Sequence, residues 1–166
     1  MTILRPERPS DAAEIAALTT RAFATAPHSG GNEAQIIAAL RDARALTLSL
    51  VLESPQGLIG HAAWSPVQIA DGTQGWYGLG PVSVAPEAQG LGHGGRLIHA
   101  GMAQLAQDHA AAGCVVLGDP AYYSRFGFAV VPGITFPNVP AEYFMAQPLQ
   151  GSLPRGEVTY HKAFYA

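Results

Sequence analysis

Hydrophobic residues recur at the helical period in two stretches near the N-terminus. The two apolar stripes comprise Ile15, Leu18 and Ala22, and then Ile36, Ile37 and Leu40. Residues with this spacing share one face of a helix, so we predict two amphipathic helices. Asp11 with Glu14, and Asn32 with Gln35, have the residue types and the spacing of capped helix starts. The first helix should end near Gly30 and Gly31.

Strand-forming residues flank these two helices. Residues 2–5 suit a first strand, and residues 47–53 and 58–69 suit two strands joined by the Ser-Pro-Gln-Gly turn at 54–57. A further apolar strand is expected at 76–85. Because short turns join successive antiparallel strands, the first half of the chain predicts hairpins that lead into this central strand.

The second half begins with a strand-helix-strand pattern. A long helical pattern over residues 92–112 is closed by Gly113 and leads into a short apolar run at 114–117. Connections of this kind are right-handed and join parallel strands. We therefore expect residues 114–117 to lie parallel to the central strand at 76–85.

The remaining chain has weaker patterns. Residues 121–125 suit a short helix, residues 126–131 a strand, and residues 157–164 a closing strand. Between these elements lie five chain-breaking prolines, Pro132, Pro137, Pro140, Pro148 and Pro154. Proline cannot donate to a strand ladder, so we predict an extended arm with at most a short strand at 143–146.

Length and composition favour one globular domain over residues 1–166, because 48% of the residues are hydrophobic and only 13% are charged. A net charge of −3 without a basic block argues against nucleic acid as a partner. No run reaches the ~18 apolar residues of a membrane helix. The lone Cys114 can form no internal disulfide, and the histidines lack the spacing of metal ligands. We therefore predict a cytoplasmic protein without a metal.

Glycines gather where the central strand passes into the long helix. The segment reads Gln89-Gly90-Leu91-Gly92-His93-Gly94-Gly95. The first N–H groups of a helix have no internal partner and carry a partial positive charge, so an anion such as a pyrophosphate can bind there. Glycine allows the backbone to come close to such a group. Pro81, inside the strand, predicts a bulge beside this loop.

The segment Gln89–Gly94 matches the Gln/Arg-x-x-Gly-x-Gly/Ala signature of the GNAT N-acetyltransferases, and Leu79, Val84 and Pro86 match the strand end that precedes it. Tyr123-Ser124-Arg125-Phe126-Gly127-Phe128 is similar to a second segment of that family. The run 117–123, Leu-Gly-Asp-Pro-Ala-Tyr-Tyr, resembles the YhbS-type branch. The resemblance implies an α/β (α+β) fold with a mixed, mostly antiparallel sheet, a splayed pair of parallel central strands and flanking helices.

The resemblance also implies acetyl-CoA as the co-substrate. The pyrophosphate would lie on the amides at 91–95, and the pantetheine arm would pair with the strand at 82–84 where the bulge splays it from its neighbour. The implied donor-binding residues are Val82, Ser83, Val84, Gln89, Gly90, Leu91, Gly92, His93, Gly94 and Gly95. A primary amine, on a small molecule or a peptide, would attack the thioester directly in a ternary complex. A homodimer is left open.

Tyr123 occupies the position of the family's general acid, although a tyrosine pair could also simply pack into the core. Glu33 and Asp119 are two candidates for the base; each could instead be structural, as a surface residue in a first helical turn or as a helix cap. His61 and His28 are solitary, and such histidines more often fill polar or core positions. Burial would make Cys114 a poor nucleophile.

Two other functions compete with acetyl transfer. Gly90, Gly92 and Gly95 satisfy the dinucleotide fingerprint Gly-x-Gly-x-x-Gly, with Asp119 as a candidate ribose ligand of an oxidoreductase. The four residues between strand and glycines, and the short remaining chain, argue against that function. A second alternative is a non-catalytic acyl-CoA sensor of the same fold, because no base is evident in the sequence.

Overall fold

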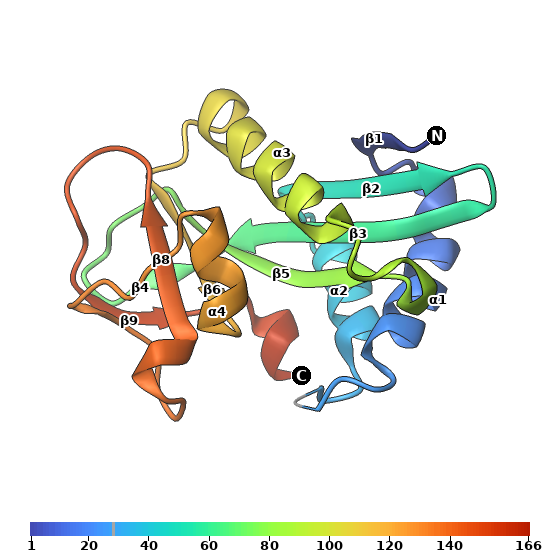
Figure 1. Cartoon of the computed structure of the whole chain (residues 1–166). Helices are drawn as coiled ribbons and strands as arrows, with labels where there is room; N and C mark the ends of the chain where they lie inside the picture. The colour runs from blue at the N-terminus through green and yellow to red at the C-terminus, as the bar shows by residue number, and fades with distance from the viewer. Residues whose placement is uncertain (28) are drawn as a thin grey trace. The chain divides into compact units, whose positions relative to one another are not determined.

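The computed structural model describes every residue except His28, and the described chain divides into two compact units. Residues 1–64 and 81–101 form the first unit, and residues 65–80 and 102–166 form the second. Strand β5 and helix α3 each contribute residues to both units. Figure 1 labels the elements along the chain.

The first unit begins with an antiparallel meander. Strand β1 (Ile3–Pro6) pairs with β2 (Leu48–Ser54), and β2 pairs with β3 (Gly57–Pro66). The hairpins predicted from the turn residues are therefore confirmed. The C-terminal part of β5 (Trp76–Val84) follows β3, where the N–H of Ala85 donates to the carbonyl of Ile59 (2.8 Å).

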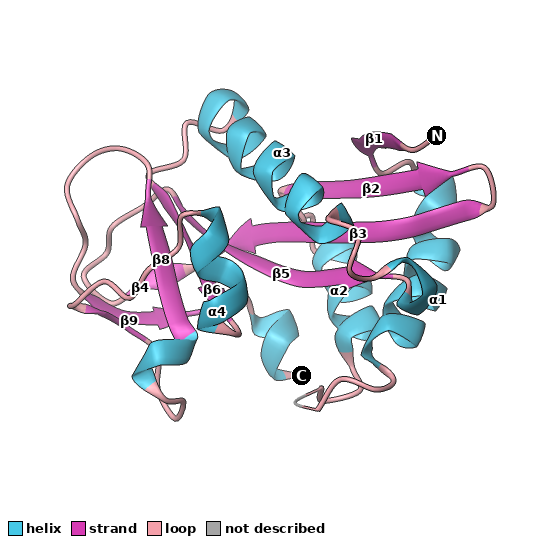
Figure 2. Cartoon of the chain, viewed as in Figure 1, coloured by secondary structure: helices cyan, strands magenta, loops and turns pink. Residues whose placement is uncertain are grey.

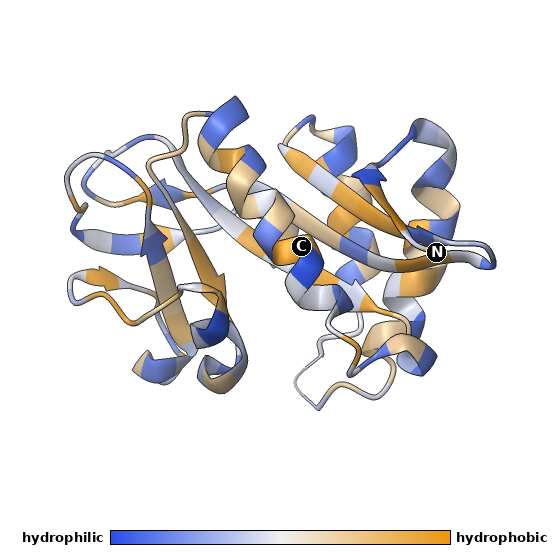
Figure 3. Ribbon diagram, turned by 45° about the horizontal axis from the view of Figure 1, so that its top comes forward, coloured by the Kyte–Doolittle hydropathy of each residue, from blue (hydrophilic) through white to orange (hydrophobic). Residues whose placement is uncertain are grey.

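Helices α1 (Ala12–Phe23) and α2 (Glu33–Asp42) cover one face of these strands (Figure 1). The buried residues of this layer, drawn from both helices and from the strands, are Ile15, Leu18, Ile37, Val51, Leu58, Ala85 and Ala88. Figure 3 shows hydrophobic and hydrophilic residues interspersed along the helices of the chain. The predicted apolar stripes thus face the core, except that Ala22 is only half-buried.

The predicted side-chain caps are absent, because neither Asp11 at the start of α1 nor Asn32 at the start of α2 accepts a capping hydrogen bond. Asp11 does not cap α1 with Glu14; its carboxylate binds the guanidinium of Arg5 (2.7 and 3.1 Å) and the N–H of Arg8 (2.7 Å). Glu14 instead accepts the N–H of Leu58 (2.7 Å) from strand β3. Arg5 holds the pKa of Asp11 down at about 2, so the carboxylate stays charged.

Helix α3 (His93–Asp108) packs against β3 on the side away from α1 and α2 (Figure 1). Gly101 lies against the indole of the buried Trp64, where a Cβ atom would overlap the ring. Leu97 lies against Gly60, so that a Cβ atom on Gly60 would come within 2.9 Å of its methyl group. Small residues therefore set how closely this helix approaches the strand.

The second unit contains the parallel pair. The N-terminal part of β5 pairs with β6 (Gly113–Leu117), and the pairs run from Trp76 with Gly113 to Leu79 with Val116. The predicted parallel crossover is therefore confirmed. Strand β8 (Phe144–Pro148) pairs antiparallel with β6 and is one residue longer than the predicted strand at 143–146. The fold is mixed α/β, and its main sheet is mostly antiparallel with the parallel pair of β5 and β6.

The second unit also contains a small three-stranded sheet (Figure 2). Strand β9 (Gly156–Thr159) lies between β4 (Gln68–Ile69) and β7 (Ile134–Thr135). The strand predicted at 58–69 therefore breaks after Pro66, and its last residues join a different sheet. The strand predicted at 157–164 is also too long, since a 3₁₀ helix begins at Lys162. The core here comprises Val67, Ile69, Trp76, Val115, Ile134, Phe144, Ala146, Val158 and Tyr160.

Two other boundaries differ from prediction. Helix α3 ends at Asp108, not at residue 112, and Gly113 lies in β6 instead of stopping the helix. The strand predicted at 126–131 is reduced to one bridge between Ala129 and Ala146.

Helix α4 (Pro120–Tyr123) continues as a 3₁₀ turn to Phe126, as the short helical pattern predicted. Across the described residues, no helix is long and apolar enough to cross a membrane.

Gly113 is required by the indole of Trp76, because a Cβ atom at residue 113 would overlap the ring. We predict that Gly113→Ala lowers the free energy of unfolding by roughly 1–3 kcal/mol, the usual cost of overpacking a core. Urea unfolding measures this. In a Trp76→Phe background, which frees space, the same substitution should cost clearly less. An equal cost in both backgrounds would contradict this packing.

Candidate active site

The glycine loop between β5 and α3 is open to solvent. Gly90 and Gly92 have left-handed backbone angles, with φ of +79° and +84°, which only glycine adopts without strain. Leu91 between them is 70% exposed, and a Cβ atom on either glycine would meet no atom within 4 Å. The loop surface is therefore accessible backbone.

The first turn of α3 presents its N–H groups at this loop. The first helical bond runs from the N–H of Arg96 to the carbonyl of Gly92 (3.0 Å). The N–H groups of His93, Gly94 and Gly95 precede this bond, so they have no partner one turn earlier in the helix. With the helix dipole behind them, these donors suit an anion.

Two side-chain contacts hold the entrance of the loop. The Gln89 amide donates to the carbonyl of Val84 (3.1 Å), which ties the loop to the end of β5. Glu87, two residues earlier, accepts two hydrogen bonds from Arg21 on α1 (2.5 and 2.7 Å). Sequence reasoning missed this exposed ion pair, because 66 positions separate its members.

Strand β5 changes conformation before it reaches the loop. Its parallel pairs with β6 end at Leu79, and the next residue, Gly80, has a φ of +137°. Pro81 then lacks the N–H that a ladder requires. The bulge predicted at Pro81 stays a prediction, while the positive φ of Gly80 marks an irregular backbone one residue earlier.

Tyr123 lies at the end of α4 in the second unit and is half-buried. Its ring makes edge contacts with Tyr122 (centroids 5.0 Å apart) and Phe128 (6.2 Å). Gly118 faces the ring, and a Cβ atom there would come within 2.5 Å of it. Burial raises the pKa of Tyr123 above its usual value, so the phenol keeps its proton at neutral pH.

The two carboxylates predicted as candidate bases both have structural partners. Glu33 begins α2 and accepts hydrogen bonds from the Ser29 hydroxyl (2.8 and 2.9 Å) and from the N–H of Gly30 (3.2 Å). Asp119 accepts the N–H of Ala121 (2.9 Å) as the N-cap of α4. Asp119 thus performs the capping role that was its structural alternative.

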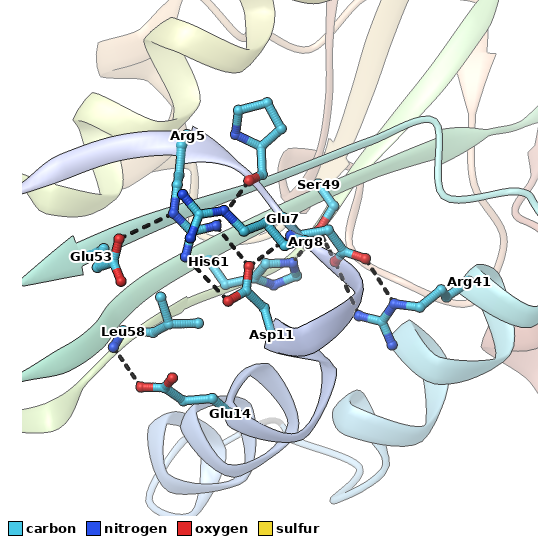
Figure 4. Close-up of polar contacts among 11 residues, drawn as sticks. Arg5, Glu7, Arg8, Asp11, Glu14, Arg41, Ser49, Glu53, Leu58 and His61 are labelled. Atoms are coloured by element: carbon cyan, nitrogen blue, oxygen red, sulfur yellow. Dashed lines mark hydrogen bonds and ion pairs between the residues drawn. The ribbon is translucent and has the colours of Figure 1, made fainter.

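His61 lies inside the first unit and has no exposed surface (Figure 4). Its Nε2 is 2.7 Å from the hydroxyl of Ser49, which donates to a Glu7 carboxylate oxygen (2.5 Å). Arg41 on α2 holds that carboxylate through two bonds (2.8 and 3.0 Å). Burial lowers the pKa of His61 from 6.5 to about 4, so the imidazole is neutral.

The remaining predicted residues are placed as follows. Cys114 is fully buried in β6, in keeping with an unreactive thiol, and His93 is the first residue of α3. His28 lies outside the described residues. Among the described residues, no group of three or more His, Cys, Asp or Glu side chains could hold a metal ion.

Comparison with known proteins identifies the class of this fold and loop. Residues 4–131 match the acetyltransferase (GNAT) domain family. Over 127 residues the chain is 38% identical to Escherichia coli K12 YhbS, named an uncharacterized N-acetyltransferase, and the match covers 76% of this chain and 72% of that protein. The chain therefore belongs to the GNAT family and is an N-acetyltransferase of that type.

Two solved structures resemble the chain over nearly its whole length. A GNAT family acetyltransferase from Brucella melitensis in complex with acetyl-CoA is 48% identical, with a TM-score of 0.87 and coverage of 99% of this chain and 98% of that one. E. coli YhbS in complex with CoA is 32% identical, with a TM-score of 0.88 and coverage of 99% and 92%. These matches support the YhbS-type resemblance seen in the sequence.

The buried His61 predicts a pH dependence of stability. In the unfolded chain His61 binds a proton near pH 6.5, but in the folded protein only near pH 4. The unfolded state therefore binds more protons between these values, and the free energy of unfolding should fall by about 3 kcal/mol as the pH drops from 6.5 to 4.

Urea unfolding between pH 7 and pH 5 follows the first part of this loss, because the carboxylates Glu7 and Asp11, whose pKa values are lowered, affect stability mainly below pH 5. His61→Gln should flatten the profile. The exposed His109→Gln serves as the matched control and should keep the native slope. A profile that His61→Gln leaves unchanged would contradict a neutral buried imidazole.

Proposed function

We propose that this enzyme transfers the acetyl group of acetyl-CoA to a primary amine, by direct attack within a ternary complex. The observation that carries the proposal is the exposed glycine loop at the start of α3, where backbone donors are open to an anion. The Brucella melitensis relative in complex with acetyl-CoA and YhbS in complex with CoA support it.

In this proposal the pyrophosphate binds the backbone N–H groups at 91–95, because the loop itself carries no cationic side chain. Gln89 holds the loop against β5 through the carbonyl of Val84. The pantetheine arm pairs with Val82, Ser83 and Val84 like an added strand. A backbone N–H near Val82 then polarises the thioester carbonyl as the tetrahedral intermediate forms.

The amine must lose protons during the reaction. An amine resembling lysine has a pKa of about 10.4, so only about one molecule in a few thousand is neutral at pH 7. Its nitrogen attacks the carbonyl carbon, the C–S bond breaks, and a thiolate leaves. We propose that Tyr123 donates a proton to this thiolate, since its raised pKa keeps the phenol in the acid form.

Family membership favours acetyl transfer over the dinucleotide oxidoreductase that the glycine spacing also allowed. A non-catalytic acyl-CoA sensor would bind the same donor on the same loop. Mass spectrometry of amine pools incubated with acetyl-CoA separates the two functions. An enzyme adds an acetyl group to an amine, whereas a sensor binds the donor and leaves every amine unmodified.

We predict that Gly92→Ala weakens CoA binding by about tenfold, equivalent to about 1.4 kcal/mol, because the added methyl group and the strained φ displace the loop amides. Isothermal titration with CoA measures the affinity. Gly72 is a matched control, since it has the same φ of +84° and equally open space around its Cβ position. Gly72→Ala should cost similar stability and leave CoA affinity unchanged; equal effects on binding would contradict the donor site.

Tyr123→Phe should lower kcat by about 100-fold, the usual size of a general-acid contribution, while CoA affinity changes little. Release of free thiol under saturating acetyl-CoA measures kcat. Tyr122→Phe removes a hydroxyl from the adjacent ring of the same aromatic cluster and provides the control. If both variants lost the same activity, the effect would come from packing and not from proton donation.

A further inference from the structure

A pocket of about 400 Å³ lies in the second unit, apart from the glycine loop. Its lining residues come from the chain between β3 and β4, from the end of β9, and from the C-terminal 3₁₀ helix at Lys162–Tyr165. A pocket of this volume suits a small molecule. The chemistry of its walls indicates which class of molecule it fits.

One part of the lining is apolar and firmly packed. It consists of Pro66, Val67 and Tyr160, and both Val67 and Tyr160 are buried. The Tyr160 ring contacts the rings of Phe136 (centroids 5.3 Å apart) and Phe164 (5.1 Å). This part of the pocket therefore suits an apolar group of a ligand.

The neighbouring residues present hydrogen-bond donors. The Nδ1 atom of His161 accepts the N–H of Ala163 (3.1 Å), so the ring hydrogen is on Nε2, which can donate. The Tyr165 oxygen accepts the N–H of Tyr160 (3.2 Å), so its own hydrogen is available to a further acceptor. His161 and Tyr165 both line the pocket, and each has a hydrogen to offer there.

Lys162 adds a positive charge to these donors. It is the only lysine of the chain and is exposed, and no ion pair of the described residues includes it. The lining residues contain no Asp or Glu. A ligand with a carboxylate would supply both the negative charge and the acceptor oxygens that this part of the pocket lacks.

The pocket adjoins strand β5 just before its pairing with β6 ends. The N–H of Val67 donates to the carbonyl of Trp76 (3.1 Å). Gly78 leaves room for the ring of Tyr160, because a Cβ atom at residue 78 would overlap it. The last pair of β5 with β6 is at Leu79, one residue further. The apolar wall of the pocket therefore lies against the part of β5 that leads into the proposed donor strand.

Tyr160 is also close to the proposed acid. Burial raises the pKa of Tyr160, and the nearby Cys114 thiol and the phenols of Tyr165 and Tyr123 raise it further. The side chain of Tyr160 is thus near Tyr165, which lines the pocket, and near Tyr123, the proposed proton donor. Both observations favour a role for this pocket in the reaction.

We propose that this pocket binds the acceptor, and that the acceptor is an amine that also carries a carboxylate and a small apolar group, as an apolar amino acid does. The inference rests on the proposed acetyl transfer and names the acceptor class for it. The carboxylate pairs with the ammonium of Lys162 and accepts from His161 and Tyr165, while the apolar group lies on Pro66 and Val67. Lys162 binds the acceptor and takes no part in bond formation.

Matched acceptors test the class of substrate. Alanine, valine and leucine are each compared with the carboxamide of the same amino acid, which keeps the amine and the side chain but lacks the negative charge. Release of free thiol from acetyl-CoA gives kcat/KM, expressed per neutral amine because the two amines differ in pKa. We expect the carboxylate form to be preferred by about tenfold or more.

Lys162→Met removes the charge and keeps an unbranched side chain. We expect the KM of the preferred amino acid to rise about tenfold, with kcat within about twofold, and the KM of its carboxamide to stay unchanged. Lys162→Arg keeps the charge and should restore most of the affinity. Added NaCl should raise the KM of the amino acid in the native enzyme and have little effect in Lys162→Met.

Arg155→Met is the matched control, since Arg155 is an exposed cation of the same unit outside the pocket. It should leave the KM of the amino acid unchanged. Carboxamides acetylated as well as amino acids, or the same KM in Lys162→Met and Arg155→Met, would overturn the acceptor pocket and leave the acetyl transfer intact. A native protein that binds CoA but acetylates no amine would overturn the acetyl transfer, and the acceptor pocket with it.

Discussion

The place of helix α3 depends on one close contact, in which Gly101 leaves room for the indole of Trp64. With a side chain at residue 101 the ring would be displaced and the helix would move away from β3. The first turn of this helix carries the N–H groups of the candidate donor site, and the close approach of Leu97 to Gly60 adds a second contact between the helix and β3. A core packing constraint therefore determines where backbone donors meet solvent.

The sequence predicted the elements of this protein better than their ends. Periodicity placed both N-terminal helices, because burial selects Ile and Leu at that spacing. Periodicity failed where contacts between residues far apart in the sequence determine the local structure. Asp11 binds Arg5 instead of capping the helix. Gly113 leaves room for the ring of Trp76 and does not end the helix. The glycine loop was evident because its signature is local, whereas the chain of Glu7, Ser49 and His61 spans residues too distant for any pattern to connect.

The polar chain that joins His61, Ser49, Glu7 and Arg41 runs from a buried imidazole to a partly exposed ion pair. Pairing Glu7 with Arg41 offsets the cost of burying the carboxylate, and the neutral His61 avoids placing a second cation in the core. Apolar residues of similar size could fill this space at no greater cost. The hydrogen bonds of Arg41 and Ser49 both end on Glu7, so this network ties α2 and β2 to the segment that follows β1.

Environment separates the roles of the titratable groups. The apolar rings around Tyr123 disfavour a phenolate, so this residue can give a proton but is poorly suited to remove one. His61 is the opposite case, because burial disfavours its cation and leaves a free acceptor nitrogen. Burial is the main cause in both cases, and for His61 it outweighs the nearby Glu7 carboxylate, which favours the charged imidazole.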